Sequence, residues 1–185
     1  MAILDGPNVR LRPLEPDEYR AVFAWYNDPE TVSPYDRFSV DTFDDFVRAV
    51  ESAPDDPGSL APRFGVVRHG EAVVLGVVGH YRPHPVLETV DVWYVIGDRA
   101  ARGHGYGREA VALLVDHLYA TTALERVGAT CDTENVASYR LLEGLGFRRE
   151  GTLEAALFHH GGWHDVHVYG VTRTQWVARN RPASR

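Results

Sequence analysis

A run of glycines interrupts the chain just before a predicted helix. The segment ARGHGYGREA, residues 101–110, places Gly103, Gly105 and Gly107 at alternate positions. Each glycine forgoes side-chain packing and costs conformational entropy when it is fixed, so three together indicate that bare backbone is required there. A loop that follows a strand and opens a helix presents its N–H groups, and the helix dipole adds about half a positive charge. These residues therefore predict an anion site that a phosphate group can approach closely.

Three phosphate-binding patterns compete for this loop. A nucleoside-triphosphate loop ends in Gly-Lys-Ser or Gly-Lys-Thr, whereas Gly107 is followed here by Arg108 and Glu109. A dinucleotide-binding loop needs glycine at position 108, and its strand normally lies near the N-terminus. The third pattern, Arg/Gln-x-x-Gly-x-Gly/Ala, is satisfied by Arg102, Gly105 and Gly107. The loop thus fits the third pattern and fails the other two.

A second motif follows the loop, with one predicted strand between the two. The segment NVASYRLLEGLGF, residues 135–147, contains Asn-x-x-Ser and then Leu-Leu-Glu-x-Leu-Gly-Phe. Together the two motifs resemble the paired signatures of the GNAT acetyltransferase superfamily. The N-terminal VRLRPLEPDE and WYNDPETV, and the closing GGWHDVHVYGV, resemble its Rim-type subgroup, which acetylates the N-termini of ribosomal proteins. The resemblance spans about residues 8–172.

The resemblance implies a fold, a cosubstrate and a reaction. The expected architecture is the α/β (α+β) GNAT fold, a mixed, mostly antiparallel sheet of six or seven strands with splayed central strands and about four flanking helices. The implied reaction moves the acetyl group of acetyl-CoA directly to a primary amine, which is a peptide N-terminus or a small molecule such as an antibiotic, polyamine or amino sugar. The implied cofactor-binding residues are Trp93, Tyr94, Val95, Ile96, Arg102, Gly103, His104, Gly105, Tyr106, Gly107, Arg108, Asn135 and Ser138. Asn135 is equally well placed to cap the helix that follows it.

Candidate catalytic residues are Ser138, Asp91 and Glu88. In Rim-type enzymes the serine three residues after the asparagine helps the thiol to leave, and that residue is Ser138 here. Many relatives carry a tyrosine where this chain has Leu142, and Rim-type enzymes carry a glutamate base where it has Leu157. With an amine pKa around 10, about one molecule in a thousand is neutral at pH 7, so the reaction needs a proton acceptor. Glu88 and Asp91 are the acids best placed by analogy with the wider superfamily.

The elements that position these residues follow from hydrophobic periodicity. Val111, Leu114, Val115 and Leu118 fall at i, i+3, i+4 and i+7, which predicts a helix over about 107–120. The other expected elements are a strand ending at Pro13, a helix carrying Tyr19, Val22, Phe23 and Tyr26, a loop at 27–38, a helix around 41–52, strands at 63–68, 71–81, 88–97 and 125–132, a helix at 136–145, and a hairpin within 154–171 that turns at Gly161–Gly162. We expect one domain over residues 1–175 and a frayed C-terminal tail at 176–185.

The histidines of HHGGWHDVH invite a metal-site interpretation. With a two-residue turn, His159 and His164 face each other across the hairpin, and His160 pairs with Trp163. Two histidines without a cysteine or carboxylate at ligand spacing make a poor zinc site, so we expect no metal.

Composition narrows the class of partner. The chain has 185 residues, a net charge of −7 and 44% apolar residues, and all 19 of its basic residues are arginine. The absence of lysine excludes Schiff-base chemistry, and the acidic balance argues against nucleic acid. No apolar run is long enough to span a membrane, and a single cysteine, Cys131, cannot form an internal disulfide, which predicts a cytoplasmic location. We expect a monomer or a homodimer.

A rival interpretation belongs to a different functional class. Leu142 and Leu157 replace polar groups that the resemblance leads us to expect, as in a non-catalytic coenzyme A-binding sensor of the same fold. Both interpretations predict stabilisation by acetyl-CoA, but release of thiol on adding an amine is expected only of the enzyme. A nucleotide-binding switch predicts stabilisation by ATP or NAD instead, and the absence of lysine argues against it.

Overall fold

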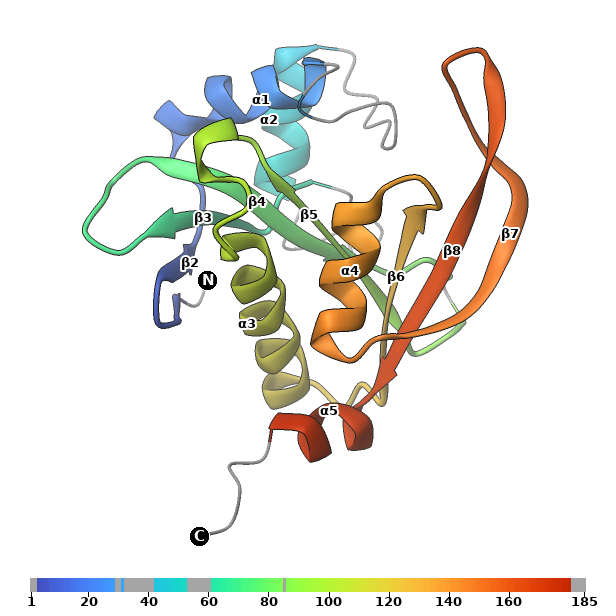
Figure 1. Ribbon diagram of the computed structural model, residues 1–185. Coiled ribbons are helices and arrows are strands. Elements are labelled where there is room, and N and C mark those ends of the chain that lie inside the picture. Colours follow the sequence, from blue (N-terminus) through green and yellow to red (C-terminus); the bar gives the residue numbers. More distant parts are fainter. Residues whose placement is uncertain (1–2, 29–30, 32–41, 53–60, 85, 181–185) are drawn as a thin grey trace, which may run out of the picture.

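A mixed sheet runs through the protein between two layers of helices (Figure 1). The computed structural model describes residues 3–28, 31, 42–52, 61–84 and 86–180. Within these residues the strands are β1 (Leu4–Asp5), β2 (Val9–Arg12), β3 (Phe64–Arg68), β4 (Val74–Tyr81), β5 (Val90–Ile96), β6 (Arg126–Asp132), β7 (Arg148–His159) and β8 (Gly162–Thr172). Their order across the sheet is β1-β2-β3-β4-β5-β6-β8-β7, and every neighbouring pair is antiparallel except β5 and β6.

Five α-helices and two short 3-10 turns, η1 (Pro16–Glu18) and η3 (Arg99–Ala101), complete the described fold. The helices are α1 (Tyr19–Asn27), α2 (Phe43–Ser52), α3 (Tyr106–Thr121), α4 (Val136–Leu145) and α5 (Arg173–Asn180). The first four lie where periodicity predicts them. In Figure 1, α1 and α2 lie on one side of the sheet, whereas α3 and α4 lie on the other. The expected loop at 27–38 falls largely outside the described residues.

Alternate residues of β5 divide the core into two clusters. Val92 packs with Leu114 of α3 in the larger cluster, which also holds the buried residues of α4. Trp93 packs with Phe46 of α2 in the smaller cluster, beside the buried residues of α1. Even-numbered side chains of β5 therefore face α3 and α4, and odd-numbered ones face α1 and α2.

The sheet parts between β5 and β6. These two strands are paired at only two positions, Val90 with Val127 and Asp91 with Gly128. On its other side β6 stays paired with β8 along its whole length, from Arg126 to Asp132. The expected splay of the central strands is confirmed, and it leaves the β6-facing backbone of β5 beyond Asp91 without a strand partner in the described sheet.

The described fold is larger than expected at both ends. The sheet has eight strands rather than six or seven, because Leu4–Asp5 adds a short edge strand against β2. The prediction of a frayed tail from residue 176 is wrong for residues 176–180, which belong to α5. Trp176 is 3% exposed, and its indole N–H donates to the carboxylate of Asp116 on α3 at 2.6 Å. One large aromatic side chain therefore anchors a segment that was expected to be frayed, while residues 181–185 lie outside the described residues.

The β7–β8 hairpin turns one residue earlier than predicted. His160 and Gly161 form the turn, with φ of 48° and 79°, as the two central positions of a type I′ turn require. His159 therefore pairs with Gly162 and Phe158 with Trp163, which corrects the predicted pairing of His160 with Trp163. His159 and His164 are diagonal neighbours rather than opposite each other, and their rings stack with centroids 3.6 Å apart.

None of the described helices is both long enough and apolar enough to cross a membrane.

Candidate active site

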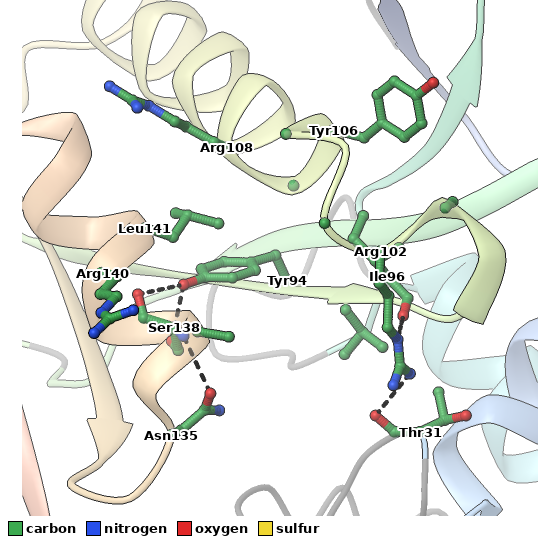
Figure 2. Close-up of a pocket in the computed structure, with 16 residues that line it drawn as sticks. Thr31, Tyr94, Ile96, Arg102, Tyr106, Arg108, Asn135, Ser138, Arg140 and Leu141 are labelled. Carbon is green, nitrogen blue, oxygen red and sulfur yellow. Dashed lines mark hydrogen bonds between the residues drawn. The ribbon is translucent and has the colours of Figure 1, made fainter.

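A cavity of about 590 Å³ opens where β5 and β6 part, on the face covered by α3 and α4 (Figure 2). Its walls come from the end of β5, the glycine loop, the first turn of α3 and the first two turns of α4. The lining residues are Thr31, Tyr94, Val95, Ile96, Ala101, Arg102, Gly103, Gly105, Tyr106, Gly107, Arg108, Asn135, Ala137, Ser138, Arg140 and Leu141.

The glycine loop supplies backbone donors to one end of the cavity. Gly105 caps α3 with φ of 83°, and Gly103 has φ of 79°, so both occupy the left-handed region that favours glycine. A Cβ atom at either position would meet nothing within 4 Å, so the space beside the loop is open. The first described backbone bond of the helix start runs from Glu109 N–H to the Gly105 carbonyl at 3.0 Å. The amides of residues 106–108 precede that bond and are left to bind a ligand.

The charge of the lining is positive in an acidic protein. Arg102, Arg108 and Arg140 line the cavity, and no carboxylate stands among its described lining residues. Glu109, in the first turn of α3, instead accepts hydrogen bonds from Asn8 and from the N–H of Val9. Although partial burial acts in the opposite direction, those bonds lower the pKa of Glu109, so the carboxylate is ionised and held at β2. The cavity therefore attracts an anion.

Two of the arginines also hold the walls in place. The Arg102 guanidinium donates to the carbonyl of Ile96 at 2.9 Å and to that of Thr31 at 3.3 Å, which ties the loop to the end of β5 (Figure 2). Arg108 donates to the carbonyl of Gly144 at 2.7 Å and so links α3 to α4. The arginine of the loop pattern thus positions the loop through its side chain.

Hydroxyl groups meet on the α4 wall of the cavity. Tyr94 points from β5 toward α4, and its hydroxyl lies 2.8 Å from Ser138 Oγ (Figure 2). Asn135 caps α4, because its side-chain oxygen accepts the Ser138 N–H at 3.1 Å. The cap leaves the side-chain amide N–H₂ of Asn135 without a partner among the described residues. This wall therefore offers a hydroxyl pair and an amide donor.

Most of the residues predicted to bind the cofactor line the cavity, but Trp93 and His104 do not. The Trp93 side chain lies on the opposite face of the sheet in the α1–α2 cluster. His104 bonds the Arg102 carbonyl through Nδ1 at 3.0 Å and stacks on Tyr106 beside a smaller, neighbouring hollow.

The three predicted catalytic residues lie in different places. Ser138 lines the cavity. Asp91 lies at the closed end of the seam with its carboxylate over Gly128, on the same face as Trp93. Burial raises the pKa of Asp91, against the opposing charge of Arg126. Glu88 lies outside the cavity on the loop before β5, where its exposed carboxylate pairs with Arg82 at 3.2 Å.

Leucines occupy the two positions where the resemblance leads us to expect polar groups, and the structure places both. Leu142 is completely buried in the larger core cluster, one residue along α4 from Leu141, which lines the cavity. Leu157 is half-buried on β7 and pairs with His164. Neither position carries a group that could exchange a proton.

Several lining residues were not predicted from the sequence, and Arg140 and Leu141 on α4 are the most informative of them. Leu141 lies at i+4 from Ala137 and at i+3 from Ser138, so the three side chains share one face of the helix. Helical periodicity could therefore have predicted that Leu141 lines the site. Thr31 reaches the cavity through tertiary structure, and its local sequence contains no comparable signal.

Comparisons with known proteins agree with this geometry. Residues 8–148 match the model of the acetyltransferase (GNAT) domain. An uncharacterized N-acetyltransferase of Bacillus subtilis, YoaA, is 24% identical over 172 residues, covering 92% of this chain and 97% of that protein.

Two solved structures share the fold. Mycobacterium smegmatis RimJ in complex with CoA-disulfide has a TM-score of 0.76 at 23% identity, covering 94% of this chain and 88% of that one. Spermidine N-acetyltransferase from Vibrio cholerae, in complex with CoA and spermine, has a TM-score of 0.79 at 19% identity, covering 93% and 99%. At these identities the likeness concerns the fold.

Proposed function

This chain belongs to the GNAT family of acetyl-CoA-dependent N-acetyltransferases, and from that premise we propose that it acetylates a primary amine directly. The acceptor is a peptide N-terminus, as the Rim-type resemblance implies, or a small-molecule amine such as an antibiotic, polyamine or amino sugar. The observation that carries the proposal is the cavity in the parted seam, which joins an anion-binding end to a pair of hydroxyl groups.

The cavity fits the chemistry of coenzyme A along its length. The backbone amides of residues 106–108 and the arginines of the lining suit a diphosphate. The edge of β5 near Tyr94–Ile96 lies beyond the residues paired with β6, and it suits the amide groups of the pantetheine arm, which can hydrogen-bond like an added strand. Asn135 has an amide N–H₂ that can donate to a carbonyl of the same arm. When bound, acetyl-CoA supplies an acetyl group activated as a thioester.

Ser138 and Tyr94 are the groups that we assign to the departing thiol. Their hydroxyls share a hydrogen bond of 2.8 Å at the wall of the cavity, so either can pass a proton through the other. A coenzyme A thiolate has a pKa near that of cysteine, so a donor helps only modestly. Ser138 therefore assists the leaving group, and Tyr94 holds the serine in position.

The acceptor amine approaches from the other face of the sheet. The coenzyme cavity lies on the α3–α4 face, which leaves the α1–α2 face of the parted seam for the amine. Asp91 lies on that side at the closed end of the seam. A net charge of −7 favours a cationic acceptor, which suits a protonated amine before it loses its proton.

A coenzyme A-binding sensor is the second candidate. It is favoured by Leu157, because the half-buried leucine replaces the carboxylate that a Rim-type enzyme places there. This candidate shares the coenzyme site and predicts no turnover.

A panel of amines tests the proposal. The protein is incubated with acetyl-CoA and, separately, with an alanine-initiated peptide, spermidine, an aminoglycoside and glucosamine, and free thiol and acetylated product are measured. We expect acetylated product from at least one amine. We also expect acetyl-CoA to raise the thermal midpoint of the protein when no amine is present. Stabilisation without product from any acceptor would favour the sensor, and the absence of both would contradict the coenzyme site itself.

A further inference from the structure

Histidines lie at the tip of the β7–β8 hairpin, and one of them, His159, contacts the last residue of β6. Over Leu153–Leu157 β7 advances four residues while β8 advances two, over His164–Val166, so β7 bulges. Within the bulge, Ala155 has φ of 47° and donates its N–H to the Asp165 carboxylate at 2.9 Å. The hairpin extends past the end of β6 in Figure 1. Beyond the bulge, the side chain of His159 lies against β6.

Hydrogen bonds connect two of these histidines to a buried carboxylate. His159 Nε2 lies 2.7 Å from Asp132 Oδ2, and His159 Nδ1 lies 3.2 Å from His160 Nδ1. Asp132 is 2% exposed and His159 is 3% exposed, whereas His160 is exposed to solvent. Asp132, His159 and His160 thus form a chain with one open end, which we call the histidine relay.

The carboxylate fixes the direction of every hydrogen bond in the relay. An ionised carboxylate only accepts, so Nε2 of His159 carries the proton that it donates to Asp132. A neutral His159 then has a lone pair at Nδ1, and Nδ1 of His160 must donate to it. Neutral His160 is left with a lone pair at Nε2, which has no partner among the described residues. The relay therefore ends in an exposed proton acceptor.

His160 occupies a turn position at which other residue types are more common. His160 has φ of 48°, a backbone conformation that asparagine and glycine adopt more readily than histidine. Gly161, the next residue, follows that preference with φ of 79°. A side chain kept at a strained position, and joined to a buried pair, points to a use for the imidazole.

The relay lies beside the opening in the sheet. Cys131 of β6 faces the α3–α4 core, so the alternation of the strand places Asp132 on the opposite face, which is the acceptor side of the seam. Asp132 is also three residues before Asn135, which lines the coenzyme cavity. This part of β6 lies beyond the last residue paired with β5.

We infer that the histidine relay accepts the proton that the acceptor ammonium must lose, an inference that rests on the proposed function. The N–H bond of the ammonium breaks, and its proton goes to Nε2 of His160. The proton at Nδ1 of His160 moves to Nδ1 of His159, whose imidazolium is balanced by Asp132. The freed lone pair forms the C–N bond as the C–S bond of the thioester breaks. The nitrogen then gives up its second proton, which replaces the one that Ser138 donates to the departing thiolate, and the relay later returns its own proton to solvent.

A metal ion is the competing interpretation of the same cluster. Ligand atoms of Asp132, His159 and His164 lie within 4.8 Å of one another. The rings of His159 and His164 stack at an interplanar angle of 16°, so their nitrogen lone pairs run nearly parallel instead of converging. Nε2 of His159 already bonds Asp132. The hydrogen-bonded arrangement favours proton transfer over coordination.

The variant His160→Asn tests the relay, because asparagine suits the turn and removes the imidazole. With the best acceptor from the amine panel, we expect kcat/KM at pH 7 to fall about 100-fold, a typical effect of losing a general base. The thermal midpoint and the affinity for acetyl-CoA should stay unchanged. His84→Asn, which removes an exposed loop imidazole between β4 and β5, is the control and should leave kcat/KM as it is.

The pH profile separates a proton acceptor from a structural role. The deficit of His160→Asn should shrink as pH rises toward 10, because the amine then loses its proton without help. Other titratable groups that face the relay are Glu134, on the loop after β6, and His164 on β8. The variant Glu134→Gln should therefore be measured together with His160→Asn. We expect any fall in kcat/KM that Glu134→Gln causes to be the same at every pH.

A spectroscopic measurement tests the relay even if no acceptor is found. Nitrogen-15 NMR of the histidine side chains at pH 8 should show His159 protonated at Nε2 and His160 protonated at Nδ1. A His160 protonated at Nε2 would overturn the inference, as would full activity of His160→Asn at pH 7, or zinc retained through purification at one ion per chain. If NMR shows the expected forms while wild-type protein acetylates no amine, the proposed function fails and the inferred base fails with it.

Discussion

At the scale of single residues, the hydroxyls of Tyr94 and Ser138 act as one unit. They share a hydrogen bond, and only Ser138 is held by a helix cap. We expect Ser138→Ala to lower kcat about tenfold, because a thiolate needs little help to leave. Tyr94→Phe should lower kcat to a similar extent, and the double variant should be no worse than the poorer single one. Steady-state kinetics with saturating acetyl-CoA measures all three.

The neighbouring Tyr139 provides the control for that pair. It follows Ser138 on α4, but its ring contacts His167 of β8 instead of Tyr94. Tyr139→Phe should therefore keep kcat within a factor of two or so. Losses that simply multiply in the Tyr94–Ser138 double variant would show that the two hydroxyls act independently.

Asp91 gives a prediction about stability and pH. Burial raises the pKa of its carboxyl in the folded protein, so the folded state binds a proton more readily than the unfolded state. The contribution of Asp91 to stability is thus fully present at low pH and is lost as pH rises through its folded-state pKa. We expect Asp91→Asn to raise the thermal midpoint at pH 7.5 and to lose that advantage near pH 4. Thermal unfolding at both pH values provides the comparison.

The same variant bears on catalysis. Because we assign proton removal to the histidine relay, Asp91→Asn should lower kcat/KM by less than tenfold or so. A loss near 100-fold that recovers at high pH would instead make Asp91 the base.

At the scale of elements, the start of α3 matters most. Gly105 has φ of 83° and open space beside it. Gly105→Ala should cost about 1 kcal/mol of unfolding free energy, the strain of alanine in a left-handed conformation. It should also weaken acetyl-CoA binding about tenfold, because the methyl group and the shifted loop keep a phosphate away from the backbone amides. Chemical denaturation and calorimetric titration measure the two effects.

Gly70, in the turn between β3 and β4, is a matched control for Gly105. It has φ of 81° and equally open surroundings, and it does not line the cavity. Gly70→Ala should cost the same stability and leave the coenzyme affinity unchanged. Equal loss of affinity in both variants would show that strain alone explains the effect of Gly105→Ala.

Elements with a strong local pattern were predictable from sequence, and those fixed by distant contacts were not. The apolar stripe of α3 is buried as predicted, with Val111, Leu114 and Val115 fully inaccessible. Helix α5 was missed because its stability comes from Trp176 packing on α3 rather than from periodicity. The hairpin turn was misplaced by one residue because both choices put glycine in the turn, and the contact of His159 with Asp132 is invisible in the sequence.

The residues of the functional site also fall into those that local motifs predict and those that depend on distant contacts. The glycine loop and the Asn-x-x-Ser motif lie within short segments, so their residues could be named before the fold was known. The bond between Tyr94 and Ser138 and the wall formed by Arg140 depend on how β5, α3 and α4 pack. The carboxylate that the histidines of the hairpin lacked in sequence, Asp132, comes from β6 through a tertiary contact.

At the scale of the whole molecule, acid should destabilise the fold through a partly buried histidine. Burial lowers the pKa of His80 on β4 from 6.5 to about 4, with the charge of Arg63 acting in the same direction. The unfolded chain binds that proton first, so stability falls as pH drops from about 6.5 to about 4, by about 3 kcal/mol for this group. His80→Gln should lose correspondingly less stability between pH 7 and pH 4. Urea unfolding at both pH values tests this, and equal losses in the two proteins would contradict it.

The central claim is that the amides at the start of α3 hold the diphosphate of coenzyme A, so that the thioester lies in the parted seam between β5 and β6. A crystal structure of the protein with coenzyme A is its most direct test. We predict diphosphate oxygens within hydrogen-bond distance of the backbone N–H groups of residues 106–108, with the thiol near Ser138. A diphosphate bound anywhere else on the molecule would contradict the account.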